Sequence, residues 1–155
     1  MKKMGVGVIG CGAISGNHFH ALKGLETAEL RAVCDQDESK LQKAMTEQGV
    51  DGCLNWRDLI ARPDIDAVHV CVPHYLHAEI SIAALKAGKH VLCEKPMGVS
   101  LQEARAMEAA ARESGKTLTV CFQNRYNGAS GRMKEVIESG ALGRKIGRAS
   151  CRERV

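Results

Sequence analysis

The segment from Val6 to Gly16, Val-Gly-Val-Ile-Gly-Cys-Gly-Ala-Ile-Ser-Gly, restricts the possible folds of this chain more than any other feature. A short β-rich apolar run leads through Gly10-x-Gly12 directly into a helical pattern, which predicts a strand, a tight turn and a helix N-terminus. Gly10 permits the turn, and Gly12 lets a diphosphate approach backbone N–H groups that a helix leaves unpaired. Ser15 stands in place of a third glycine and is small enough for close packing of helix on strand. Because Gly-x-Gly turns are common, the segment alone also fits an ordinary turn.

Charge and composition argue against a nucleic-acid partner. The net charge of +4 comes entirely from residues 144–155, which hold five basic residues and one acidic residue, while the rest of the chain is balanced. With only 3% aromatic residues, the neutral body offers neither a phosphate-binding face nor a stacking platform. No apolar run approaches the roughly 18 residues that span a membrane, so we expect no membrane partner either.

The cysteines predict a cytoplasmic protein without disulfides. Their number, seven, is odd, and no two of them form a Cys-x-x-Cys pair. Cys34, Cys71, Cys93 and Cys121 each fall in or at the end of an apolar run, where a reduced thiol behaves as a small buried hydrophobe.

Strand and helix patterns alternate along the chain with short connections. We expect strands at 6–9, 28–34, 52–54, 65–72, 90–93 and 117–122. Helical patterns lie between them, including one that Asp37 caps and Gly49 ends, and one that a Ser100–Glu103 capping box begins. This alternation predicts an α/β fold with a doubly wound parallel sheet of the Rossmann type.

The pattern changes after residue 123. We expect residues 1–123 to form a dinucleotide-binding domain and residues 124–143, with one helix at 133–139, to begin a substrate domain. Residues 144–155 form a basic tail without periodicity that looks foreign to the domain.

Two strand ends carry candidate site residues. Asp35 follows Gly10 by 25 residues, where a carboxylate can accept hydrogen bonds from the ribose hydroxyls of NAD and repel the 2′-phosphate of NADP. The alternative is a loop aspartate beside the next helix, and Lys40 is a nearby cation that keeps NADP open. Lys95, in Glu94-Lys95-Pro96, can hold a hydroxyl or carbonyl oxygen and stabilise developing charge, although a solvated loop lysine fits the same position.

Pro73 and His77 follow the preceding strand and are expected at the same edge of the sheet. His74 and His77 are spaced like metal ligands, but no cysteine or carboxylate joins them, so we predict no metal site. We place His18 in the first helix and His69 in the sheet, without a role for either.

Several motifs, in order, resemble the N-terminal half of the Gfo/Idh/MocA family of oxidoreductases. They are Gly-Val-Ile-Gly-Cys-Gly-Ala-Ile-Ser at 7–15, Ala-Val-Cys-Asp at 32–35, Val-Pro-His-Tyr-Leu-His at 72–77 and Ala-Gly-Lys-His-Val-Leu-Cys-Glu-Lys-Pro at 87–96. The resemblance covers roughly residues 4–143. It implies a homo-oligomeric, nicotinamide-dependent oxidoreductase that acts on sugars, cyclitols or related polyols.

The resemblance also assigns roles to single residues. It implies that the diphosphate is cradled by Gly10, Gly12, Ala13 and Ile14, and that Asp35 binds the adenosine ribose. Pro73, His77 and Glu94 would line the nicotinamide side, and Lys95 would contact both cofactor and substrate as the catalytic residue.

Members of that family are about twice as long and carry a second, α+β domain with the substrate pocket. We therefore expect this chain to be a truncated cofactor-binding half that is inactive alone. The alternative is a non-catalytic dinucleotide-binding module, such as a sensor or a corepressor-like relative.

Overall fold

The computed structural model describes residues 3–144. The chain divides after Cys121 into two compact units, and each is considered by itself. Apart from Arg144, the predicted basic tail at 144–155 lies outside the described residues.

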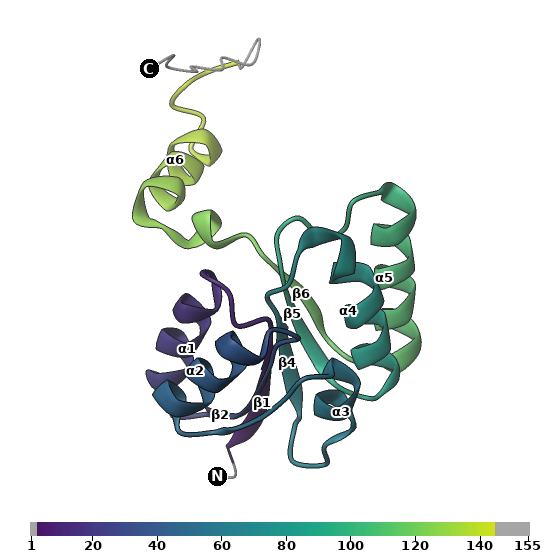
Figure 1. Ribbon diagram of the computed structural model, residues 1–155. Helices are drawn as coiled ribbons and strands as arrows, with labels where there is room; N and C mark the ends of the chain where they lie inside the picture. Colours follow the sequence, from purple (N-terminus) through teal and green to yellow (C-terminus); the bar gives the residue numbers. More distant parts are fainter. Residues whose placement is uncertain (1–2, 145–155) are drawn as a thin grey trace, which may run out of the picture. The chain divides into compact units, whose positions relative to one another are not determined.

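The first unit contains a single parallel sheet, shown in Figure 1. Its strand order is β3-β2-β1-β4-β5-β6, and every neighbouring pair is parallel. The strands are β1 (Met4–Ile9), β2 (Ala28–Cys34), β3 (Asp51–Cys53), β4 (Ala67–Val70), β5 (His90–Glu94) and β6 (Leu118–Cys121). The chain moves outward from β1 to β3 and then returns to the other side of β1, which confirms the predicted doubly wound sheet.

Helices cover both faces of this sheet. They are α1 (Ser15–Lys23), α2 (Glu38–Gln48), α3 (Trp56–Ala61), α4 (His77–Lys86) and α5 (Leu101–Ser114), with a 3₁₀ turn, η1 (His74–Leu76), before α4. Figure 1 shows α1 and α2 on one face and α3, α4 and α5 on the other. Each face has its own apolar core: Phe19, Leu22 and Leu41 pack in one, and Leu59, Ile80 and Met107 in the other.

Local signals in the sequence set the ends of several helices. The Asp37 carboxylate accepts hydrogen bonds from the N–H groups of Ser39 (3.0 Å) and Lys40 (3.2 Å), and Gly49 ends α2 with a left-handed φ of 67°. At α5, the Ser100 hydroxyl accepts from the Glu103 N–H at 3.1 Å, as the predicted capping box requires.

The strands expected at 6–9, 52–54, 90–93 and 117–122 differ from the structure by one or two residues at their ends, and two further boundaries are wrong. The strand expected at 65–72 is limited to Ala67–Val70, because its partner β1 ends at Ile9 and no longer offers a ladder beyond that residue. In the second unit, which contains η2 (Gln123–Tyr126), the helix expected at 133–139 is α6 (Gly128–Glu138). It begins five residues earlier because Asn127 Oδ1 caps it by accepting from the Ser130 N–H at 2.7 Å.

None of the helices within residues 3–144 has both the length and the apolar character that crossing a membrane requires. Within the same range, Cys11, Cys34, Cys53, Cys71 and Cys93 are thiols outside any disulfide.

Gly10, directly after β1, lies close to the chain at the ends of β2 and β4. Its φ is +96°, and a Cβ built on it would lie 2.5 Å from the Cys71 carbonyl oxygen, which belongs to rigid backbone. The Gly10 N–H donates to the Cys34 carbonyl at 2.7 Å. Only glycine fits this position, both for its φ and for its space.

We predict that Gly10→Ala lowers the free energy of unfolding by about 2–5 kcal/mol, because it combines a disfavoured φ with a backbone clash. Urea unfolding followed by circular dichroism measures this change. Gly12→Ala is the matched control, since no protein atom lies within 4 Å of a Cβ there. Equal free energies of unfolding for Gly10→Ala and Gly12→Ala would contradict the requirement for glycine at position 10.

Candidate functional site

A cleft of about 640 Å³ lies where the central strands end. It contains the ends of β1, β2 and β4, where the strand order reverses and where open parallel sheets bind ligands. The lining residues are Ile9, Gly10, Gly12, Ala13, Ile14, Cys34, Asp35, Gln36, Lys40, Leu54, Asn55, Trp56, Arg57, Cys71, Val72, Pro73, Leu76 and Ile80.

The loop between β1 and α1 forms one wall of the cleft. A Cβ on Gly12 would meet no protein atom within 4 Å, so the space in front of this residue is open. Within residues 3–144, the N–H groups of Gly12 and Ala13 have no hydrogen-bond acceptor. The Ser15 hydroxyl donates to the Gly12 carbonyl at 2.7 Å and fixes the loop. Two free amides ahead of a helix N-terminus are suited to bind an anionic group.

Asp35 faces this loop from the end of β2. Its Oδ2 accepts from the Cys11 N–H at 2.7 Å, and its Oδ1 accepts from the Asp37 N–H at 2.8 Å. The carboxylate is therefore held in a fixed orientation. Since each of its oxygens can accept a second hydrogen bond, it can still bind a diol.

An apolar wall that the sequence analysis missed lies beside Asp35. Leu54, Trp56 and Leu76 contribute to it. The Arg57 guanidinium lies 4.0 Å from the centroid of the Trp56 ring and also donates to Glu79 at 2.9 Å, which holds the indole in place. The available signal was the position of Trp56, three residues beyond the end of β3 at the same edge of the sheet.

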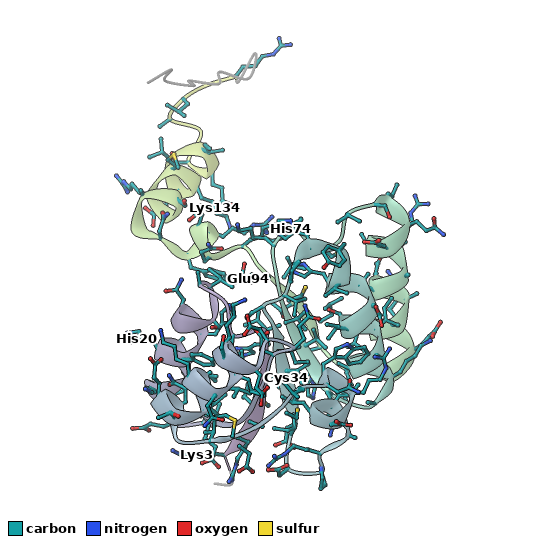
Figure 2. All side chains as sticks on the ribbon, viewed as in Figure 1. Lys3, His20, Cys34, His74, Glu94 and Lys134 are labelled. Carbon is teal, nitrogen blue, oxygen red and sulfur yellow. The ribbon has the colours of Figure 1, made fainter. Side chains whose placement is uncertain are left out.

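Glu94, labelled in Figure 2, lies at the end of β5. It is buried in a polar network and is not among the residues that line the cleft. Its Oε1 lies 3.1 Å from His18 Nε2, and its Oε2 accepts from the Lys95 N–H at 3.1 Å. His18 Nδ1 lies 3.2 Å from His69 Nδ1. The signal that could have found this network is the buried stripe of α1, where His18 lies among Ser15, Phe19 and Leu22.

The network controls the charges of its members. Burial raises the pKa of the Glu94 carboxyl, but hydrogen bonds from His18 and from the Lys95 amide outweigh burial and hold the pKa below its usual value. Burial, with a smaller contribution from His18, lowers the pKa of His69 from 6.5 to about 4. At neutral pH, Glu94 is therefore ionised and His69 is neutral.

The predicted site residues are divided by the structure into two groups. Those that line the cleft are Gly10, Gly12, Ala13, Ile14, Asp35 and Pro73. His77, Glu94 and Lys95 do not line it. Lys95 is exposed at the end of β5, whereas His77 is fully buried, with Nδ1 2.7 Å from the Pro96 carbonyl oxygen and Nε2 3.0 Å from that of Val72.

The thiols beside the cleft are not suited to act as nucleophiles. Burial, assisted by the Asp35 charge, raises the pKa of Cys11 to about 12, and burial raises that of Cys34 as well, so both are neutral at pH 7. Across residues 3–144, no group of three or more His, Cys, Asp or Glu side chains is arranged to hold a metal ion.

A doubly wound parallel sheet, a glycine loop with free amides and an acidic residue at the end of β2 together define a dinucleotide-binding Rossmann domain. Residues 4–122 match the model of the oxidoreductase family with an NAD-binding Rossmann fold, GFO_IDH_MocA. The chain therefore belongs to the Gfo/Idh/MocA family, and the cofactor of this domain is NAD.

Relatives with assigned names include dehydrogenases of cyclitols and sugars. Myo-inositol 2-dehydrogenase from Thermotoga maritima is 34% identical over 91% of this chain and 42% of the relative. The WlbA dehydrogenase from Bordetella pertussis, in complex with NADH and UDP-GlcNAcA, matches with a TM-score of 0.89 and 35% identity, over 92% of this chain and 42% of that one.

Scyllo-inositol dehydrogenase from Lactobacillus casei, with bound NAD(H) and scyllo-inositol, matches with a TM-score of 0.86 and 26% identity, over 92% of this chain and 43% of that one. The chain thus spans about two fifths of the length of these relatives.

The lowered pKa of His69 predicts that the fold is sensitive to acid. Between about pH 6.5 and pH 4 the unfolded chain binds a proton at this histidine that the folded chain rejects, so stability falls as the pH falls through this window. We expect the melting temperature of the wild type to drop between about pH 7 and pH 4.5 by about 5–10 °C more than that of His69→Gln.

His20→Gln, which alters an exposed histidine on α1, is the control and should follow the wild type. If the melting temperatures of the wild type and of His69→Gln changed with pH in parallel, the lowered pKa of His69 in the folded chain would be contradicted.

Proposed function

We propose that this chain is the cofactor-binding part of an oxidoreductase that transfers hydride between NAD and a carbon–oxygen bond of a sugar, cyclitol or related polyol. The observation that carries the proposal is the pairing of the open Gly12 loop with the fixed Asp35 carboxylate across one cleft. The named relatives support the substrate class, because those with assigned names act on or bind such molecules.

The site residues have different roles in binding the cofactor and the substrate. The loop of Gly10, Gly12, Ala13 and Ile14 binds the diphosphate through backbone N–H groups, and Asp35 accepts from the adenosine ribose hydroxyls. Pro73 borders the nicotinamide side. Lys95 holds the substrate oxygen and stabilises the charge that develops there. NAD, when bound, supplies the hydride acceptor. Direct contacts from His77 and Glu94 to the cofactor stay a prediction.

The charges around Asp35 favour NAD over NADP. Asp35 repels a 2′-phosphate, and Lys40, the cation that could compensate, pairs with Asp37 at 3.0 Å. A 2′-phosphate would thus meet one carboxylate directly and a lysine that already has an acidic partner.

We predict that Asp35→Ser weakens NAD binding about 10- to 100-fold, the cost of losing charge-assisted hydrogen bonds of about 1–3 kcal/mol. The same change should narrow the preference for NAD over NADP. Calorimetric titration of residues 1–155 with both dinucleotides measures both effects. Gln36→Ser, an uncharged change in the same cleft, is the control. Tighter binding of NADP than of NAD by the unmutated chain would refute the assignment of Asp35.

Lys95 favours an enzyme over a binding module, because a protein that only binds the dinucleotide has less need of an exposed cation at the end of β5. Assembly of the enzyme into a homo-oligomer is part of the same proposal. Hydride transfer also needs a substrate held against the nicotinamide, and the groups for this are expected in the part of the relatives that residues 1–155 do not match.

We therefore predict that residues 1–155 bind NADH but do not reduce NAD with any polyol. The measurement is NADH absorbance over a panel of inositols and sugars, with binding followed in parallel through Trp56, the only tryptophan of the chain. Sustained turnover by the monodisperse chain would show that residues 1–155 suffice for catalysis.

A further inference from the structure

The segment Glu94–Pro96, which carries Lys95, is held by two buried histidines from opposite faces of the sheet. His18, on α1, reaches the Glu94 carboxylate at 3.1 Å. His77, on α4, lies 2.7 Å from the Pro96 carbonyl oxygen. The exposed fractions of the His18 and His77 residues are only 6% and 0%. Neither imidazole is among the residues that line the cleft.

On the α1 side the contacts run without interruption from the glycine loop to Lys95. Ser15 holds the Gly12 carbonyl, and one helical turn later His18 holds Oε1 of Glu94. The other carboxylate oxygen of Glu94 accepts from the Lys95 N–H at 3.1 Å. A carboxylate can only accept, so His18 Nε2 carries the proton in this contact. In the contact between His18 and His69, one Nδ1 donates and the other accepts.

On the α4 side, His77 bridges the segment to the end of β4. Its second ring nitrogen lies 3.0 Å from the Val72 carbonyl oxygen, directly before Pro73 in the cleft wall. The ring thus lies between the chain after β5 and the chain after β4. Since a carbonyl oxygen only accepts, an imidazole with one N–H donates to one of these two carbonyls and packs against the other. Removing the imidazole leaves buried polar groups without hydrogen-bond partners, and this destabilises the local conformation of the backbone around them.

We propose that His18 and His77 are positioning residues that clamp the Glu94–Pro96 segment, fix the backbone of Lys95 and tie it to the diphosphate-binding loop. The proposal rests on the function proposed above for its consequence in catalysis. In this role both imidazoles act on Lys95 through the main chain and the Glu94 carboxylate. Through α1, a dinucleotide that binds at the Gly12 loop then also restrains the backbone of Lys95.

Hydrogen exchange at the Lys95 amide tests the clamp without any cofactor. We expect His18→Leu and His77→Leu to accelerate this exchange at least about 10-fold relative to the exchange of Val68, a buried β4 amide that reports global opening. His18→Gln keeps an N–H donor near the position of Nε2 and should restore the wild-type rate. His20→Leu, an exposed change on the same helix, is the control.

If His18→Leu does not fold, Glu94→Gln replaces it, because the amide keeps the shape of the carboxylate and removes its charge. Exchange at Lys95 that rises only in proportion to that at Val68, or equally in His20→Leu, would overturn the clamp.

A second experiment repeats the hydrogen-exchange measurement in the presence of NADH. We expect NADH to slow exchange at Lys95 in the wild type and in His20→Leu but not in His18→Leu, although all three bind it. Slowing that persists in His18→Leu would overturn the coupling through α1. Absence of NADH binding by the wild type would instead refute the proposed function, while the cofactor-free arm would still decide whether the clamp exists.

Discussion

The close approach of Gly10, directly after β1, to Cys71, directly after β4, is the constraint on which the rest of the structure depends. A carbonyl oxygen of Cys71 occupies the space that a side chain would take, and the positive φ turns the chain away from the sheet. Because of this turn, the Gly12 loop and the first turn of α1 lie over the ends of β1 and β2. The Cys11 N–H then reaches Asp35 at 2.7 Å. The absence of a side chain at Gly10 thus brings the open Gly12 loop and the Asp35 carboxylate into one cleft.

Local chemistry made much of the fold predictable. The strand Ala28–Cys34 and the helix between Asp37 and Gly49 were predicted at the correct residues, because an apolar run, an Asx cap and a left-handed glycine are all readable from nearby sequence. The carboxyl end of β4 was not, because it depends on where its partner β1 stops. Asn127, which starts α6, carries a cap signal that was overlooked behind the apolar residues 133–137.

The site was predictable where it is made of backbone and strand ends, and not where it is made of buried side-chain pairs. Gly12 and Asp35 follow from a motif and its spacing, and both line the cleft. The partners of Glu94 could not be deduced, because His18 is 76 residues away from it in the sequence and the pair meets only when α1 packs on the sheet. The sequence therefore named Glu94 and His77 but not the partners that bury them.

Chemical-shift mapping by NMR tests the central claim, that the cleft at Gly12 binds NAD, most directly. Titration of ¹⁵N-labelled residues 1–155 with NAD should produce saturable shifts at the amides of Gly12, Ala13 and Asp35, and none at Lys116, which precedes β6 at the opposite edge of the sheet. A Cβ at Gly12 meets no protein atom within 4 Å, so Gly12→Val, which extends into the open space before the loop, should keep the spectrum of the fold and lose these shifts. Saturable shifts that persist in Gly12→Val, or that cluster around Lys116, would contradict the account.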